Sequence, residues 1–259
     1  MDLSLKGKIA VVTGGSKGIG LAIVRALVAE GVEVTVAART EFPELAELGD
    51  AVTWAGVDLT TRRGAEQLAG RVGEVDILVN NLGGAIEPSL RAAGFPGIDD
   101  DAWQQTFELN LFSAVRVTRS LLSRLLRRRG VVINISSVSG RELCGPADYG
   151  AAKAALTYLG KALAEQYGGQ GLRALTVTPG IVATPRVTDP GGLFGPGARA
   201  AGEDFAEFMA KLPERMGITV GRLAEPEEIA ALVTFLASPL AGTLTGAEYL
   251  ADGGILKTV

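Results

Sequence analysis

The segment that decides the fold is Ile9-Ala10-Val11-Val12-Thr13-Gly14-Gly15-Ser16-Lys17-Gly18-Ile19-Gly20, where a short β-branched run leads directly into glycines. A helical pattern follows over residues 18–30. Glycines at such a junction let the backbone turn sharply and approach a phosphate, while the N–H groups that begin the helix attract an anion. The Gly-x-x-x-Gly-x-Gly spacing therefore predicts a site for a dinucleotide pyrophosphate, with an ordinary glycine turn as the alternative.

Strand-like and helix-like patterns alternate along the rest of the chain. Strands are expected at residues 8–12, 32–37, 51–57, 75–80, 131–136, 172–178 and 248–251. Helices are expected near residues 18–30, 42–48, 61–72, 100–129, 148–168, 203–212 and 225–237. This alternation predicts an α/β fold, a doubly wound parallel sheet with helices on both faces. No linker or repeat interrupts it, so residues 1–259 are expected to form one Rossmann-type domain.

The composition excludes several kinds of chemistry. The chain of 259 residues has no histidine and one cysteine, Cys144. A Ser-His-Asp triad, a histidine zinc site and an intrachain disulfide are therefore excluded, and no metal site is expected. Acid-base catalysis would have to use Tyr, Lys, Asp, Glu or water.

The charge and hydropathy of the chain indicate where it acts. The net charge is −4, which gives no general attraction to nucleic acid or to acidic membranes. The longest apolar stretch, Ile229 to Ala237, is too short to span a bilayer. No signal-peptide pattern is recognised at the N-terminus, so a cytoplasmic protein is expected.

The predicted helix over residues 100–129 has apolar side chains on more than one face. A helix that is apolar nearly all round must be covered on both sides, and the sheet can cover only one. A second subunit could cover the other, so a homotetramer or homodimer is expected. The looser segment 186–219 is expected to form a substrate lid, with a merely mobile insertion as the alternative. Its apolar residues favour a hydrophobic substrate; they are Leu193, Phe194, Phe205, Phe208, Met209 and Leu212.

The end of the second predicted strand bears on the choice of cofactor. An acidic residue there binds the ribose 2′-hydroxyl of NAD, whereas basic residues accept the 2′-phosphate of NADP. The chain has Ala38 followed by Arg39, and Lys17 belongs to the glycine turn. NADP(H) is therefore predicted, unless both cations are ordinary surface charges.

Tyr149 and Lys153 lie four residues apart at the start of a predicted helix, and hence on one face. The pair follows Asn134-Ile135-Ser136-Ser137 after a short loop. A neighbouring ammonium favours the phenolate, so the pKa of Tyr149 is expected to be lowered toward the physiological range. Tyr149 is then a usable proton donor in a chain without histidine.

Taken together, these motifs resemble the short-chain dehydrogenase/reductase family over nearly the whole chain. They are Thr13-Gly14-Gly15-Ser16-Lys17-Gly18-Ile19-Gly20, Val57-Asp58-Leu59, Asn80-Asn81-Leu82-Gly83, Asn110, Ser137, Tyr149-Gly150-Ala151-Ala152-Lys153, Pro179-Gly180-Ile181-Val182-Ala183-Thr184, Thr245-Gly246 and Asp252-Gly253-Gly254. The resemblance implies a seven-stranded sheet in the order 3-2-1-4-5-6-7.

The resemblance also implies roles for individual residues. Tyr149 would be the general acid, Ser137 would bind the substrate carbonyl, Lys153 would hold the nicotinamide ribose, and Asn110 would hold a relay water. Asp58 would meet the adenine amino group, and Ile181 and Thr184 would hold the nicotinamide. The full set of cofactor-binding residues implied is Gly14, Ser16, Lys17, Gly18, Ile19, Gly20, Arg39, Asp58, Leu59, Asn81, Gly83, Tyr149, Lys153, Pro179, Gly180, Ile181 and Thr184.

One of these assignments has a competing residue. The position of the strand favours Ser137 as the catalytic serine, whereas counting back from Tyr149 favours Ser136. We take Ser137, because the strand determines where the residue lies.

The implied activity is NADPH-dependent reduction of a ketone to a secondary alcohol, on a hydrophobic small molecule or an acyl thioester, as in 3-oxoacyl reductases. The partner is then a small-molecule ketone or alcohol. Two alternatives stay open: an NAD(P)-linked alcohol dehydrogenase acting in the oxidative direction, and a non-catalytic NADPH-binding protein on the same fold.

Overall fold

Seven parallel strands form one sheet in the order β3-β2-β1-β4-β5-β6-β7, as the family resemblance implies. The computed structural model describes residues 2–257. The strands are β1 Ile9–Thr13, β2 Glu33–Ala38, β3 Val52–Gly56, β4 Ile77–Asn80, β5 Val131–Ile135, β6 Arg173–Pro179 and β7 Glu248–Ala251. The predicted strand ends are correct to within two residues.

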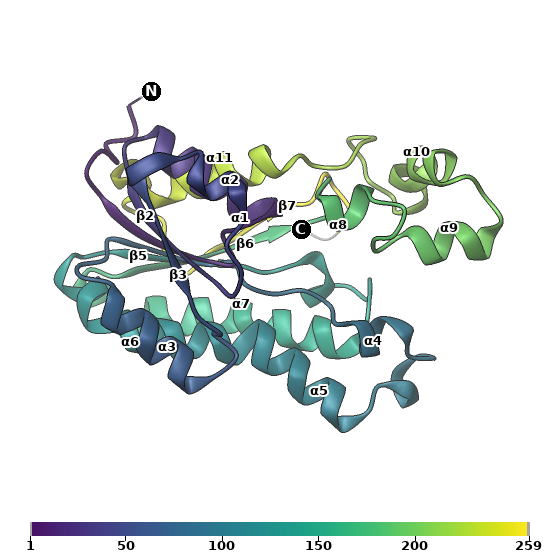
Figure 1. The fold of residues 1–259 in the computed structure, drawn as a ribbon, viewed down its shortest axis with the longest axis horizontal. Helices are drawn as coiled ribbons and strands as arrows, with labels where there is room; N and C mark the ends of the chain where they lie inside the picture. The colour runs from purple at the N-terminus through teal and green to yellow at the C-terminus, as the bar shows by residue number, and fades with distance from the viewer. Residues whose placement is uncertain (1, 258–259) are drawn as a thin grey trace.

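Helices cover both faces of this sheet (Figure 1). They are α1 Gly18–Ala29, α2 Pro43–Ala46, α3 Arg62–Arg71, α4 Glu87–Arg91, α5 Asp100–Phe107, α6 Ser113–Arg127, α7 Ala147–Tyr167, α8 Pro185–Thr188, α9 Gly195–Ala201, α10 Phe205–Arg215 and α11 Pro226–Ala237. Successive side chains of β1 point to opposite faces, as the strand geometry requires. Val12 packs in the core beneath α1 and α11, whereas Val11 packs in the core beneath α3, α6 and α7.

The helix predicted over residues 100–129 is interrupted, which corrects the sequence prediction. A π-helical turn, η3 Glu108–Phe112, separates α5 from α6. Apolar periodicity does not reveal a single π turn, because the turn adds only about one residue to an otherwise helical pattern. The turn places the amide of Asn110 in the interior, where the residue is fully buried. Such turns often occur at functional sites.

The segment 186–219 contains α10, which the sequence predicts at residues 203–212, and in addition most of α8 and all of α9, which it does not predict. Helices α9 and α10 extend beyond the sheet on the side away from the N-terminus (Figure 1). Phe208 and Leu212 pack with Ala198 in a small core of their own, together with Phe194, Phe205 and Met209. These apolar side chains therefore hold α9 against α10, and they are weaker support for a hydrophobic substrate than the sequence suggested.

The carboxyl ends of β1 and β4 meet where the strand order reverses, and Thr13 links them. Its hydroxyl donates to Val79 O at 3.3 Å and accepts from the backbone N–H groups of Asn81 and Leu82, each at 3.0 Å. Ligands of open α/β sheets bind at such a point. Among residues 2–257, none of the helices has the length and apolar character needed to cross a membrane.

Candidate active site

The glycine turn between β1 and α1 leaves the start of the helix open. Gly14 and Gly18 have φ values of +64° and +53°, which favour glycine. A methyl group on Gly20 would lie 2.3 Å from Gly14 O, so the turn and helix approach too closely for a side chain. Lys17 makes no side-chain cap, and the first turn of α1 contains no acidic residue. The free N–H groups and the positive dipole end at the start of α1 fit a pyrophosphate.

Asn81 supports this turn from below. Its Nδ2 donates to Thr13 O at 3.1 Å and to Gly14 O at 3.0 Å, so both of its donor hydrogens are used within the protein. Ser16 is buried in the same turn. The side chain of Asn81 therefore stabilises the backbone that a dinucleotide would contact.

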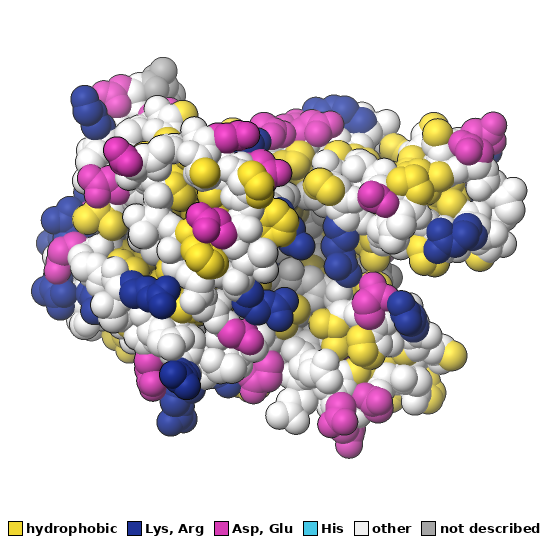
Figure 2. Space-filling model, viewed as in Figure 1, with side chains coloured by type: hydrophobic (Ala, Val, Ile, Leu, Met, Phe, Trp, Pro, Cys, Tyr) yellow, Lys and Arg dark blue, Asp and Glu magenta, His cyan; other side chains and the backbone are white. Residues whose placement is uncertain are grey.

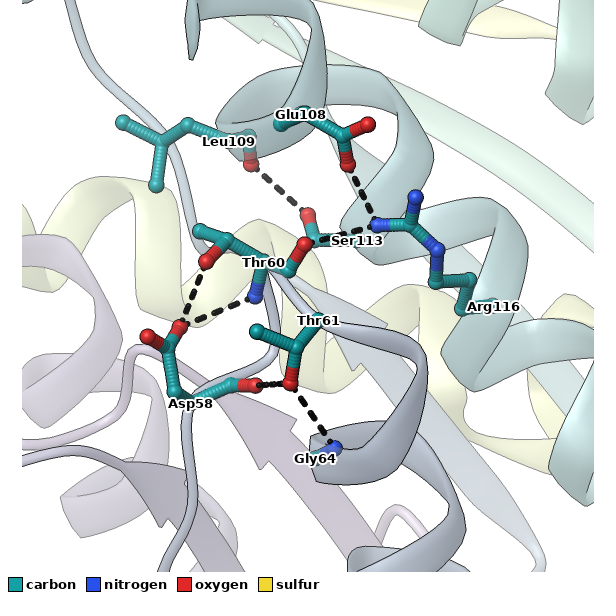
Figure 3. Close-up of polar contacts among 8 residues, drawn as sticks. All are labelled: Asp58, Thr60, Thr61, Gly64, Glu108, Leu109, Ser113 and Arg116. Carbon is teal, nitrogen blue, oxygen red and sulfur yellow. Dashed lines mark hydrogen bonds and ion pairs between the residues drawn. The ribbon is translucent and has the colours of Figure 1, made fainter.

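Asp58 lies after β3 in a tight polar turn (Figure 3). Its Oδ1 accepts from Thr60 N at 3.0 Å and from Thr60 Oγ1 at 2.7 Å, and Arg116 connects the turn to η3 by donating to Thr60 O and Glu108. The Thr60 hydrogen bonds, and then the Arg39 charge, hold the pKa of Asp58 below its usual value. Asp58 is thus an ionised acceptor suited to an amino group. The side chain of Leu59, by contrast, is buried in the core, so only its backbone can face a ligand.

The corner at the end of β2 is basic. Lys17 Nζ lies 5.9 Å from the ring centroid of Phe42, and the charge of Arg39 acts on Asp58. Within residues 2–257, neither Lys17 nor Arg39 forms an ion pair. Ala38 ends the strand, and its carbonyl accepts from Trp54 Nε1 at 3.1 Å. Two cations that form no ion pair among the described residues therefore lie at this corner.

The segment after β6 closes the other side of the crevice. Pro179 ends the strand beside Ala251, and a methyl group on Gly180 would lie 2.8 Å from Asp252 O. Ile181 O accepts from Ala224 N at 3.2 Å. A Cβ on Gly18 would lie 3.3 Å from Thr184 Cγ2. Thr184 therefore lies directly against the glycine turn, as a residue in contact with a dinucleotide would.

The two candidate serines face different parts of the protein. Ser136 is buried, and its hydroxyl lies 3.0 Å from Lys153 O and 2.9 Å from Thr157 Oγ1, both on α7. The hydroxyl of Ser137 accepts from Ser139 N at 3.2 Å and forms a hydrogen bond that lowers the pKa of Tyr149. Only Ser137 is thus placed beside the phenol.

Lys153 and Asn110 converge on Gly83. A methyl group on Gly83 would lie 2.6 Å from Asn110 Oδ1 and 2.8 Å from Lys153 Nζ. Asn110 Oδ1 accepts from Gly84 N at 2.8 Å, and its Nδ2 donates to Gly84 O at 3.0 Å. Lys153 Nζ donates to Ile135 O at 2.9 Å and lies 5.8 Å from the ring centroid of Tyr149. Strands β4 and β5, the π turn and α7 therefore bring their polar groups to one place.

The pKa of Tyr149 departs from the prediction. Burial raises it above the usual value for tyrosine, while the Ser137 hydrogen bond and the Arg186 charge lower it in part. Burial also lowers the pKa of Lys153 to about 8, so its ammonium is less fully formed than the prediction assumed. In this structure Tyr149 keeps its proton, which suits a group that donates one.

The Lys153 ammonium leads to a pH prediction. A group with a pKa of about 8 is charged below that pH and loses its charge above it. If the charge supports catalysis, kcat/KM for reduction at saturating cofactor should be constant below about pH 7 and fall roughly tenfold per unit above about pH 9. Steady-state rates between pH 6 and 10 measure this. A flat profile to pH 10 would contradict it.

Sequence analysis missed a fully buried carboxylate, that of Asp148, beside Tyr149. Its Oδ2 accepts from Ser89 Oγ at 2.6 Å and from Thr106 Oγ1 at 2.5 Å. Thr106 O in turn accepts from Asn110 Nδ2 at 2.9 Å. Asp148 therefore connects α4 and α5 to the first turn of α7. The only sequence signal for it was an acidic residue immediately before the tyrosine.

Arg186 was also missed, because it lies just outside the motif that ends at Thr184 and its partner Ala85 is distant in sequence. Its Nη2 donates to Ala85 O at 2.7 Å, and its charge lowers the pKa of Tyr149. Cys144 also lies close enough to Tyr149 to influence its pKa, and its Sγ is 3.4 Å from Ser139 Oγ.

The chain is similar to known proteins over its whole length. Residues 8–190 match the family described as short chain dehydrogenase. The chain is 38% identical over 273 aligned residues to the oxidoreductase YvaG of Bacillus subtilis, with both chains fully covered. It is 34% identical to the 3-oxoacyl-[acyl-carrier-protein] reductase FabG of Salmonella typhimurium, over 98% of this chain and 99% of FabG. The crystal structure of L-sorbose reductase from Gluconobacter frateurii, complexed with NADPH and L-sorbose, matches with a TM-score of 0.87 and 32% identity, and both chains are fully covered.

Proposed function

The chain belongs to the short-chain dehydrogenase family of oxidoreductases, and from that membership we propose that it reduces a ketone to a secondary alcohol with NADPH. The observation that carries the proposal is the convergence of Ser137, Tyr149, Lys153 and Asn110 at the carboxyl ends of β4 and β5. The similarity to a 3-oxoacyl-[acyl-carrier-protein] reductase and to L-sorbose reductase supports the direction of the reaction.

The proposed mechanism assigns one step to each group. The bound NADPH supplies the hydride that reaches the carbonyl carbon. Ser137 donates a hydrogen bond to the carbonyl oxygen and stabilises its developing negative charge. Tyr149 transfers its phenolic proton to that oxygen, so the product is neutral. Lys153 stabilises the resulting phenolate, and Asn110 holds the backbone at Gly84 and supports the return of a proton from solvent.

The direct test is oxidation of NADPH by purified protein in the presence of a panel of ketones, followed at 340 nm. We expect ketone-dependent oxidation that yields equimolar alcohol. Turnover only of alcohols with NAD(P)⁺ would favour the oxidative alternative, and cofactor binding without turnover of either class would favour a non-catalytic protein.

We further propose that Lys17 and Arg39 select NADPH over NADH. Both can make charge-assisted hydrogen bonds to a 2′-phosphate, and the guanidinium can contact two of its oxygens at once. Because the corner is solvent-accessible, screening limits the combined preference to about 10- to 100-fold.

The double substitution Ala38→Asp with Arg39→Ala is expected to move the preference toward NADH. The new carboxylate would accept from a 2′-hydroxyl and repel a 2′-phosphate, while one cation is lost. The measurement is kcat/KM for each cofactor with one ketone, and the wild-type preference should shrink as salt is added. Equal wild-type values, or no movement in the variant, would show that this corner does not select the cofactor.

We propose that residues 186–219 act as the substrate lid, and that the protein is a cytoplasmic homotetramer or homodimer. Exposed apolar side chains on α7 and at the η3–α6 junction support association, since Tyr158 is 74% exposed and Phe112 is 41% exposed. Light scattering at micromolar concentration should give the mass of a dimer or tetramer. A monomeric mass would contradict the proposal.

A 3-oxoacyl thioester is a second candidate substrate class. It is favoured by the likeness to FabG rather than by a feature of the site. Comparing 3-oxoacyl thioesters with simple ketones in the same assay would separate the two.

A further inference from the structure

Arg186 connects two segments of the chain within electrostatic reach of Tyr149. It belongs to α8, which begins directly after Thr184, and its Nη2 donates to Ala85 O at 2.7 Å. Ala85 follows Gly84, whose backbone N–H and C=O are both hydrogen-bonded to Asn110. The guanidinium therefore joins the segment after β6 to the segment after β4, on the two sides of the proposed reaction centre.

A cleft is visible in this region of the surface (Figure 2). It separates the part of the molecule that carries α9 and α10 from the part that carries α4 and α5, and Lys and Arg side chains line its inner end. The substrate side of the molecule is therefore not simply apolar. The small core formed by Phe208, Leu212 and Ala198 is consistent with this, because it directs apolar lid residues toward one another.

The charge of Arg186 is not neutralised within the part of the chain that the structure describes. No carboxylate among residues 2–257 forms an ion pair with it, and its one hydrogen bond is to a neutral backbone carbonyl. A guanidinium has five N–H donors, so most of them are available to a ligand. The charge of Arg186 also lowers the pKa of Tyr149, so the two side chains lie within electrostatic reach of each other.

We propose that Arg186 is a specificity-determining residue that binds an anionic group, a carboxylate or a phosphate, carried by the substrate close to its ketone. This inference rests on the proposed ketone reduction and narrows its substrate class. The guanidinium fork matches the oxygens of both anions, and a charged acceptor would displace the weaker bond to Ala85 O. Arg186 is exposed, so screening limits the expected preference for an anionic substrate to about 10- to 100-fold.

The cofactor pyrophosphate is the competing anion. Thr184 lies against Gly18 of the glycine turn, and Arg186 is only two residues further along the chain. The bond to Ala85 O and the effect on Tyr149 favour the substrate side instead. The KM for NADPH separates these two roles, because only a pyrophosphate contact would raise it with every ketone.

The test compares ketones that differ in one charge. Benzoylformate and its methyl ester form the carboxylate pair, and dihydroxyacetone phosphate and dihydroxyacetone form the phosphate pair. In the wild type the anionic member of at least one pair should have the higher kcat/KM, and Arg186→Met should lower that ratio by about tenfold or more. Arg186→Lys should restore part of it. The pair that responds identifies the anion.

Arg199→Met is the matched control. Arg199 is another exposed lid arginine with a bond to a carbonyl, Pro190 O at 3.4 Å, and its loss changes the net charge equally. Its variant should keep the wild-type ratio. An equal fall in both variants, a wild-type ratio near one for both pairs, or a higher KM for NADPH with all ketones in Arg186→Met would overturn the proposal.

A binding measurement separates this inference from the reaction itself. Calorimetry of the protein saturated with NADP⁺ should show benzoate binding more tightly than benzamide, and Arg186→Met should remove the difference. No preference for benzoate would overturn the role of Arg186 even if ketones are reduced. A preference that depends on Arg186, in a protein that reduces no ketone, would overturn the proposed function and leave anion binding standing.

Discussion

Tyr149→Phe is expected to lower kcat for ketone reduction by about 100- to 10,000-fold, because a positioned general acid contributes that much to a proton transfer. The phenol is hydrogen-bonded to Ser137 and keeps its proton at neutral pH, since burial raises its pKa. Phenylalanine preserves the ring that Lys153 Nζ approaches and removes only the hydroxyl. Stopped-flow rates at saturating NADPH and ketone measure the effect.

The control for this substitution lies on the same helix. Tyr158 is 74% exposed on α7, so Tyr158→Phe should leave kcat within about twofold of wild type. NADPH binding, followed by fluorescence, should survive in both variants. Retention in Tyr149→Phe of more than about a tenth of the wild-type kcat, a barrier change below about 1.4 kcal/mol, would remove Tyr149 from the role of proton donor.

Ser137→Ala is expected to lower kcat by about 100- to 1,000-fold, the usual loss when one preorganised donor to a developing oxyanion is removed. The structure provides the comparison in the neighbouring residue. Ser136 directs its hydroxyl to Lys153 O and Thr157 Oγ1, away from the phenol. Ser136→Ala should therefore lower the free energy of unfolding by about 1 kcal/mol, through the lost buried hydrogen bond, with a much smaller change in kcat.

Steady-state kinetics and thermal unfolding of the two alanine variants separate these effects. The outcome that contradicts the assignment is the reverse one, in which Ser136→Ala loses activity and Ser137→Ala keeps it. Restoration of activity by Ser137→Thr would add that a hydroxyl at this position is what catalysis requires.

The sequence alone was sufficient to predict the architecture. Apolar strand segments such as Ile77–Asn80 alternate with helical periodicity, and the glycines between Gly14 and Gly20 can serve few purposes other than a tight turn before a helix. These signals are local, because period, turn chemistry and helix start depend on residues a few positions apart. For the same reason, the composition and the Tyr149–Lys153 spacing were enough to direct attention to a tyrosine as the acid.

Other features depended on contacts between distant residues, which no local pattern records. Hydrogen bonds between the Asn110 side chain and the backbone of Gly84 stabilise the π turn. The buried carboxylate of Asp148 accepts hydrogen bonds from hydroxyl groups on two other helices. The direction of the Tyr149 pKa was predicted wrongly because burial, a property of the whole fold, outweighs the neighbouring ammonium.

The lid and the cleft likewise combine features that the sequence predicts with features that only tertiary contacts decide. Sequence identified Phe208 and Leu212 as apolar lid residues, but only the packing of α10 on α9 showed that they are buried against Ala198. The sequence indicated no role for Arg186, because its hydrogen-bond acceptor, Ala85 O, lies 101 residues away along the chain. What the sequence determined was therefore which groups are available and which elements carry them. The tertiary structure decided which of them meet and which are desolvated, because solvation and through-space distance are set by chain segments that come together only on folding.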